Sequence, residues 1–217
     1  MRQLVILMII VVLASCNNSS KQETSSVDVL PYYDEATFTP KWYDSEGLVP
    51  QDFHKIPEFS LINQLGDSVS EKLLDGKITI VDFFFTSCPG ICPKMTGNMT
   101  LVQEEFLNDD HIMILSHSVT PEHDSVSVLK DYAIEKGVVD GKWHLLTGDR
   151  KEIYMLGRSE YFVEEDLGLV KSPDDFLHTE NFILVDANRH IRGIYNGLNK
   201  TAINQLIADI KTLESTL

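Results

Sequence analysis

The sequence predicts an α/β domain over residues 56–217, in which helices flank a central mixed β-sheet and a hairpin opens the domain. Three observations support this fold class. Residues 78–85 are almost entirely apolar and rich in β-branched and aromatic side chains, which is typical of a buried central strand. Strand-like and helix-like patterns then alternate along the chain. A hairpin pattern followed by an amphipathic helix ends the domain.

The opening hairpin is predicted from a short alternating segment. Residues 59–62 alternate, a turn sequence follows at 63–67, and Val69 resumes the apolar pattern. Residues 70–74 fit a single helical turn that ends before Gly76. The buried strand 78–85 comes directly after it.

The remaining elements follow from the spacing of apolar residues and from end signals. Pro93 suits the first turn of a helix, and Asp124 and Asp149 are predicted as N-caps. Further strands are predicted at 111–119, 143–146, 181–185 and 190–195, and helices at 93–107, 124–135, 149–156 and 201–213. The side chains expected to face the core from the first two helices are Met95, Met99, Val102, Phe106, Val128, Leu129, Tyr132 and Ala133. Right-handed crossovers place the end of strand 78–85 at the carboxyl edge of the sheet, where open α/β sheets hold their sites.

The charge balance excludes one class of partner. The chain has 33 acidic and 18 basic residues and a net charge of −15. A nucleic-acid-binding protein needs a basic face, so no nucleic-acid partner is expected. The negative field would attract cations and basic surfaces, although solubility alone also explains it.

The first 15 residues have the pattern of a secretory signal. Arg2 precedes an apolar run at 4–14, which is too short to span a bilayer as a helix. The sequence Leu-Ala-Ser-Cys that ends at Cys16 resembles the bacterial lipobox, in which the cysteine is lipidated and becomes the first residue of the mature chain. We therefore expect a lipoprotein anchored at Cys16 to a bacterial membrane, outside the cytoplasm on the periplasmic side. Residues 16–55 are predicted to form a tether, disordered to about residue 30, and then an irregular arm.

Cys88 and Cys92 are the only cysteines left once Cys16 is assigned to the lipid. Their spacing lets two side chains share one face of a helical turn, so they can form a disulfide or bind one ion. The positive end of the helix that starts near Pro93 favours thiolates. Soft thiolates select Cu(I), zinc or an iron–sulfur cluster, and two sulfurs without further protein ligands suit copper best. A structural disulfide is the alternative, but it would close a very small loop and add little stability.

A third copper ligand is expected among the seven histidines. His178 follows a long irregular segment at 168–176 and precedes the strand 181–185, so its loop could bring an imidazole over a site at the neighbouring edge. A solvated loop histidine is the alternative interpretation. Most of the others are expected to be surface residues at strand ends or in loops: His111, His117, His123, His144 and His190.

With these residues in place, the sequence resembles the Sco/SenC family of copper-binding, thioredoxin-like proteins linked to assembly of cytochrome c oxidase. The segment Phe-Phe-Phe-Thr-Ser-Cys-Pro-Gly-Ile-Cys-Pro at 83–93 is similar to the family signature Phe-x-Phe-Thr-x-Cys-Pro-x-x-Cys-Pro. Leu177-His178-Thr179, placed before a strand and hairpin, matches the copper-ligand histidine of the family. The opening hairpin 56–67 and the turn 118–124 also resemble it, and the whole resemblance spans about 56–213.

The resemblance implies a thioredoxin-like fold with Cys88, Cys92 and His178 as copper ligands. It implies delivery of copper to the binuclear copper site of the oxidase, reduction of the cysteines of that site, or both. The partner would be the copper-containing subunit of cytochrome c oxidase or another copper or thiol protein. The alternative is a thiol–disulfide oxidoreductase with Cys88 and Cys92 as its redox-active pair and no obligatory metal. Two departures from the family pattern are Thr120 in place of Asp and Ser87 where many members have His.

Overall fold

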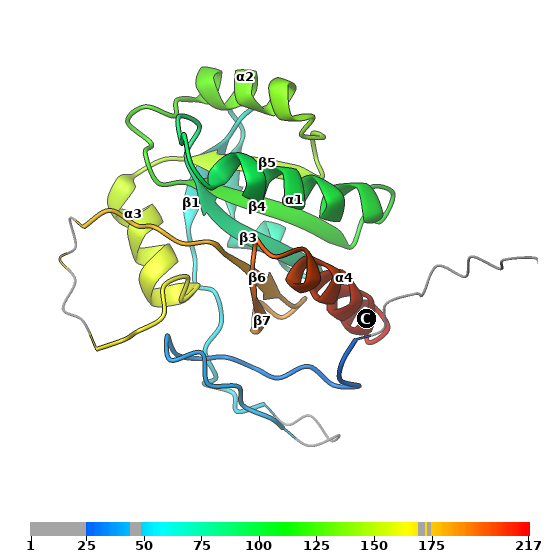
Figure 1. The fold of residues 1–217 in the computed structure, drawn as a ribbon. Helices are drawn as coiled ribbons and strands as arrows, with labels where there is room; N and C mark the ends of the chain where they lie inside the picture. Colours follow the sequence, from blue (N-terminus) through cyan, green and yellow to red (C-terminus); the bar gives the residue numbers. More distant parts are fainter. Residues whose placement is uncertain (1–24, 44–48, 169–171, 173–174) are drawn as a thin grey trace, which may run out of the picture.

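The chain is described by a computed structural model that covers residues 25–43, 49–168, 172 and 175–217 (Figure 1). One sheet of seven strands, in the order β2-β1-β5-β4-β3-β6-β7, forms its centre. The strands β3, β4 and β5 are parallel to one another, whereas β1 and β6 pair antiparallel to β5 and β3. The strands are β1 (Ser60–Asn63), β2 (Ser68–Ser70), β3 (Ile78–Phe84), β4 (Ile112–Ser118), β5 (Trp143–Thr147), β6 (Asn181–Val185) and β7 (Ile191–Asn196). The predicted mixed sheet and the thioredoxin-like fold are confirmed.

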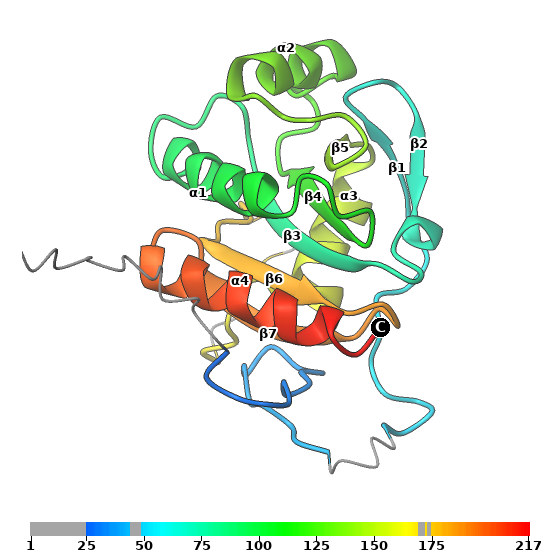
Figure 2. The same cartoon turned by 90° about the vertical axis from the view of Figure 1, so that its right-hand side faces the viewer.

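Helices cover both faces of the sheet, as predicted (Figure 2). The helices α1 (Cys92–Glu105), α2 (Val126–Lys136) and α4 (Lys200–Glu214) contribute to the core on one face. On the other face lies α3 (Arg150–Met155), which continues into the π-helical turn η2 (Leu156–Glu160). A short 3₁₀ turn, η1 (Glu71–Leu73), links the opening hairpin to β3 where the sequence predicted one helical turn. Gly76 follows it with φ of 75°, a conformation that glycine adopts without steric cost.

Strand β3 is buried along its whole length, between β4 and β6. Ile78, Ile80 and Phe84 belong to the core under α1 and α4, while Val81 and Phe83 belong to the core under α3. A continuous apolar run is what a strand needs when both of its faces are covered. The chain therefore leaves β3 at a fixed point in the middle of the sheet edge, with the cysteine loop directly after it.

Two details of α2 differ from the prediction. Its N-cap is Ser125, whose Oγ accepts a hydrogen bond from the N–H of Val128 at 3.5 Å, and not Asp124. The Asp124 side chain turns instead toward Thr86 and Ser118. Val128 was expected in the core but is 37% exposed, whereas the other three predicted residues, Leu129, Tyr132 and Ala133, are buried.

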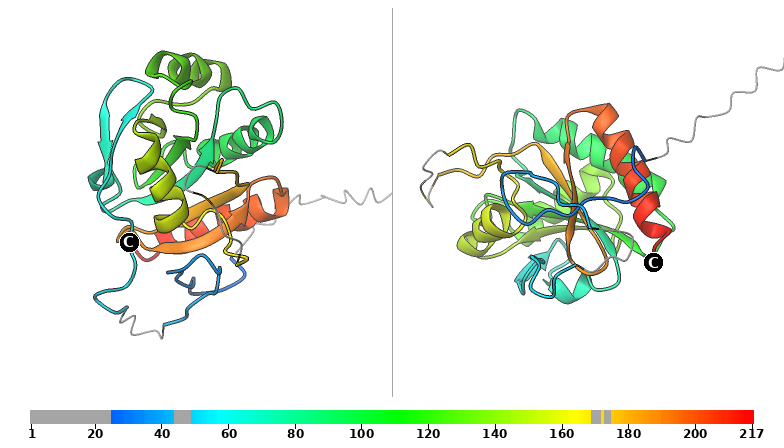
Figure 3. Two further views of the ribbon diagram at one scale, coloured as in Figure 1. Left: turned by 90° about the vertical axis from the view of Figure 1, so that its left-hand side faces the viewer. Right: turned by 90° about the horizontal axis from the view of Figure 1, so that it is seen from below.

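The arm before the domain packs on β7 and does not stay apart from it (Figure 3). Leu30, which the sequence placed at the end of a disordered tether, is 3% exposed and joins the core. Arg192 on β7 donates hydrogen bonds to the carbonyl oxygens of Leu30 and Pro31, and it pairs with Asp186 at 3.0 Å. Tyr33 forms an antiparallel bridge with Ile191, the first residue of β7.

The predicted signal segment and Cys16 lie outside the described residues. Within the ranges that the structure describes, no helix is both long enough and apolar enough to span a bilayer.

Two ionisable side chains are buried near the centre of the sheet. Burial raises the pKa of Asp82 to about 7, although a hydrogen bond from Ser116 partly offsets this effect. His117 was predicted to be a surface residue, but it is fully buried and stacks on Phe83 with ring centroids 4.8 Å apart. Its burial lowers the pKa of the imidazole to about 3.

These pKa shifts predict opposite effects of pH on folding stability. The folded-state pKa of Asp82 lies above its ordinary value of 3.8, so its contribution is fully present below pH 4 and is lost as pH rises toward 7. Asp82→Asn should remove this loss, which amounts to at most about 4 kcal/mol for a shift of this size. The free energy of unfolding from urea titrations at pH 4 to 7 measures the difference.

His117 acts in the other direction and provides the comparison. Its folded-state pKa lies below 6.5, so its contribution is present above that pH and is lost as pH falls toward 3. His117→Phe should therefore flatten the acid side of the stability curve.

If the stability curves of Asp82→Asn and the wild type run parallel from pH 4 to 7, Asp82 does not titrate as inferred.

Candidate metal centre

The cysteine loop lies at the carboxyl ends of β3 and β4, between β3 and α1 (Figure 1). Cys92 is the first residue of α1 and Pro93 occupies its first turn, as the sequence predicted. The backbone N–H groups at the start of a helix lack partners within the helix and carry its positive dipole end. The loop therefore presents a sulfur to the part of a helix that best stabilises a negative charge.

The two cysteines are free thiols in different surroundings. Cys88 is half-buried and Cys92 is 4% exposed. Partial burial acts to raise the pKa of Cys88, but its sulfur accepts hydrogen bonds from the Cys92 thiol and from backbone N–H groups of Cys92, Gly90 and Ile91. These hydrogen bonds outweigh the burial and lower the pKa of Cys88 below its usual range.

The pKa of Cys92 shifts in the opposite direction. Burial is the main cause that raises its pKa to about 12, and the hydrogen bond to Cys88 and the charges of Cys88 and Asp82 add to it. Only one of the two sulfurs is therefore readily deprotonated. The influence of Asp82 on Cys92 was not foreseen, although a lone acidic residue in an otherwise apolar strand was the signal that could have identified it.

His178 lies on a segment that packs against the end of β3. Leu177 is 1% exposed. Gly157 packs closely against both Leu177 and Phe83, because a Cβ atom on Gly157 would lie 2.7 Å from the Leu177 side chain and 3.0 Å from the Phe83 ring. Leu177 therefore lies beside Phe83 of β3. Beside it, the Phe176 ring meets the Phe85 ring edge-on, with centroids 5.4 Å apart. The structure thus brings the His178 segment to the end of β3, where the cysteine loop begins.

The imidazole itself is exposed and is not gathered with the two sulfurs. In the described part of the chain, no three His, Cys, Asp or Glu side chains are close enough together to hold a metal ion. The thiol pair offers soft donors suited to Cu(I), and a three-ligand site with His178 would require the segment to move. The assignment of His178 as a ligand stays a prediction.

Met95 and Met99, which follow the loop on α1, are 1% and 0% exposed. They belong to the core, as predicted, and offer no ligand at the surface.

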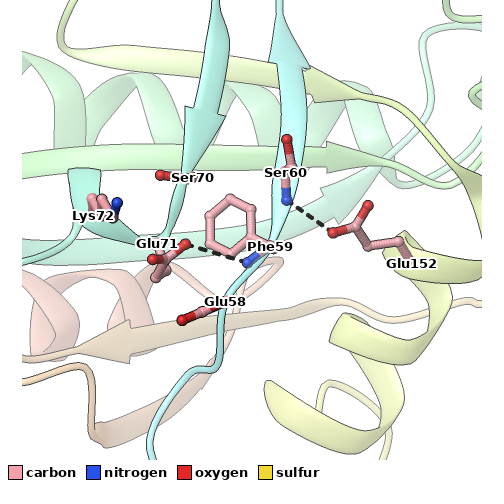
Figure 4. Close-up of a pocket in the computed structure, with 7 residues that line it drawn as sticks. All are labelled: Glu58, Phe59, Ser60, Ser70, Glu71, Lys72 and Glu152. Atoms are coloured by element: carbon pink, nitrogen blue, oxygen red, sulfur yellow. Dashed lines mark hydrogen bonds between the residues drawn. The ribbon is translucent and has the colours of Figure 1, made fainter.

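A separate pocket of about 410 Å³ lies between the opening hairpin and α3 (Figure 4). Two of its three acidic side chains bind the backbone: Glu152 accepts a hydrogen bond from the N–H of Ser60 at 2.8 Å, and Glu71 accepts one from the N–H of Phe59 at 3.4 Å. These contacts fix the start of β1. The pocket holds no thiol or imidazole, so the cysteine loop remains the better candidate for metal chemistry.

Comparisons with known proteins identify the family of the chain. A family model described as SCO1/SenC matches residues 49–215, which include the cysteine loop and His178. The chain belongs to the SCO1/SenC family. A SCO1 protein homolog of Bacillus subtilis is 32% identical over 164 residues, which cover 73% of this chain and 82% of the relative.

Two solved structures extend the comparison. BsSco, described as a member of the Sco family of cytochrome c oxidase assembly proteins with a disulfide switch, has a TM-score of 0.64 and 31% identity and covers 76% of this chain and 95% of its own. ScoI of Bradyrhizobium japonicum with copper bound has a TM-score of 0.57 and 27% identity, with 72% of this chain and 98% of its own covered. Copper and a disulfide thus both occur among the structures that this SCO1/SenC protein resembles.

The unequal pKa values predict unequal reactivity of the two thiols. At pH 7, iodoacetamide should alkylate Cys88 at least about tenfold faster than Cys92, because thiolate character and exposure both favour Cys88. Mass spectrometry of timed digests measures both rates in the reduced protein. In urea the two rates should become similar, and a native Cys92 that reacted as fast as Cys88 would contradict the assignment.

Proposed function

We propose that this SCO1/SenC protein binds copper through Cys88, Cys92 and His178 and delivers it to the binuclear copper site of cytochrome c oxidase. The observation that supports this most is the convergence of the free thiol pair and the His178 segment on the end of β3. The copper-bound ScoI structure is a relative of the same fold. Copper would be the cargo of this site, bound from one protein and released to another.

The arrangement suits reversible binding. Two soft sulfurs select Cu(I), and Cys88 supplies the more easily formed thiolate. Cys92 must lose its proton when copper binds, so binding would release protons and weaken at low pH. An exposed imidazole that must approach the thiols would close the site after copper enters and reopen it for transfer.

A second function has its own support. One thiol with a lowered pKa beside one with a raised pKa is the arrangement of a nucleophilic and a resolving cysteine. Cys88 would attack a partner disulfide, and Cys92 would then release the reduced partner as the Cys88–Cys92 disulfide forms. This chemistry would reduce the cysteines of the oxidase copper site and needs no metal.

Copper binding through His178 is tested by His178→Ala. Titration of the reduced domain with Cu(I) against a competing chelator should show at least about tenfold weaker binding than the wild type, because a lost metal ligand typically costs more than 1.4 kcal/mol. The Cys88–Cys92 reduction potential should hardly change. The control is His111→Ala, because His111 is an exposed histidine that lies just before β4.

Two outcomes would contradict the copper proposal. If the reduced wild type takes up no stoichiometric copper, the delivery function fails and the thiol–disulfide function is left. If His178→Ala binds copper as tightly as His111→Ala does, the site uses the thiols without His178.

The location of the protein is part of the proposal. The lipobox-like sequence at Cys16 would tether the domain to a membrane on the extracytoplasmic side, where a donor to the oxidase would work. Cys16→Ser should move the protein from the membrane pellet to the soluble extracytoplasmic fraction on cell fractionation. A variant that stayed in the membrane pellet would exclude the lipid as the anchor.

A further inference from the structure

Asp124 is a fully buried carboxylate at the base of the cysteine loop. Its Oδ1 accepts a hydrogen bond from Thr86 Oγ1 at 2.5 Å. Its Oδ2 accepts three more, from the backbone N–H of Thr86 at 3.2 Å, from Ser118 Oγ at 2.5 Å and from Thr120 Oγ1 at 3.1 Å. Across the described residues, no basic side chain forms an ion pair with it.

A buried charge without a counter-ion is costly unless hydrogen bonds replace its hydration. Here four neutral donors do so, and all of them lie in the last residue of β4 or in the chain directly after β3 and β4. An ordinary N-cap role would have used the same side chain for α2, but Ser125 takes that role. Asp124 therefore joins the ends of two strands and does not serve its own helix.

Thr86 connects Asp124 to the cysteine loop. Asp124 holds both its backbone N–H and its hydroxyl, which fixes the direction of the chain two residues before Cys88. The N–H of Cys88 in turn donates to the carbonyl oxygen of Phe85 at 3.3 Å. With the loop held in this way, Cys88 is placed just before the first turn of α1, which begins at Cys92 and whose N–H groups lack partners within the helix.

We propose that Asp124 is a positioning residue that, through Thr86, holds Cys88 against the N–H groups at the start of α1. It touches neither sulfur. Its effect is to stabilise the reduced dithiol relative to the disulfide and to keep the thiol pair in a geometry that can receive copper. Only the copper part of this statement rests on the proposed function.

The test is the reduction potential of the Cys88–Cys92 couple, which takes up two electrons and two protons and needs no copper. An Asn side chain places an N–H₂ group where Asp124 accepts hydrogen bonds, so Asp124→Asn should loosen Thr86 and weaken N–H donation to Cys88. Equilibration with glutathione buffers should show the dithiol disfavoured about tenfold, which is a shift of about 30 mV to a more negative potential.

Thr86→Val and Thr86→Ser distinguish the effect of Asp124 on the reduction potential, which acts through Thr86, from a general loss of stability. The Val variant removes the hydroxyl donor alone and should shift the potential in the same direction, even if Asp124→Asn does not fold. The Ser variant keeps the hydroxyl donor, so its reduction potential should equal that of the wild type.

Asp209→Asn is the matched control. Asp209 is also a buried carboxylate that accepts hydrogen bonds from hydroxyl groups, from Tyr195 at 2.7 Å and Ser25 at 2.5 Å, but it lies on α4. This variant should lower the melting temperature without changing the potential. An equal shift in Asp209→Asn, or an unchanged or more positive potential in both Asp124→Asn and Thr86→Val, would overturn the proposal.

Copper titration of the same reduced variants keeps the two proposals distinguishable. Asp124→Asn and Thr86→Val should bind Cu(I) more weakly than Asp209→Asn does. If the wild type itself takes up no copper while the potentials shift as expected, the delivery function fails and the positioning role of Asp124 stands.

Discussion

Strand β3 is buried on both faces, and this burial determines where the neighbouring elements and the cysteine loop lie. Seven consecutive residues lie in the middle of the sheet, paired with β4 on one side and β6 on the other. Each large apolar side chain buried there contributes about 2 kcal/mol, so a shift of register would cost several side chains at once. The strand therefore ends at a single place, and the thiol loop, α1 and the His178 segment are all located relative to that end. The position of the thiol loop therefore depends on this strand and not on the loop itself.

Buried polar residues in and beside β3 and β4 influence the cysteines at the end of β3. Asp82, His117 and Asp124 are all nearly or fully buried, and each belongs to β3, to β4 or to the turn after β4. In a medium of low dielectric constant, such groups influence neighbouring charges more strongly than they would in water. Asp82 makes Cys92 harder to ionise, whereas Asp124 acts through hydrogen bonds on the chain before Cys88. The contrast between the two cysteines thus originates mainly in the burial of Cys92 and in the hydrogen bonds to the Cys88 sulfur, and the buried charge of Asp82 adds to it.

The sequence was sufficient to predict the elements and the site loop because both depend on local patterns. The run before Cys88, Pro93 at the start of α1 and Asp149 as a cap were read from neighbouring residues. Asp124 was misassigned because its hydrogen bonds connect it to Thr86, which lies 38 residues away, and a cap and a tertiary junction have the same local sequence. His117 was misjudged for a related reason, since only the packing of Phe83 and Tyr161 around it shows its burial. Copper ligation by His178 stays a prediction, because the arrangement of side chains around a metal depends on packing that a sequence pattern does not encode.

The N-terminal arm has a consequence for how this sheet behaves among other molecules. An open sheet ends in strands whose free backbone groups can pair with another chain and start aggregation. Here the arm lies along β7, bridges it through Tyr33 and is fixed by Arg192, while the opposite edge is the three-residue strand β2. Neither edge offers a long, flat template for strand addition. The arm and the short strand β2 therefore reduce the backbone surface through which copies of this chain could pair with one another.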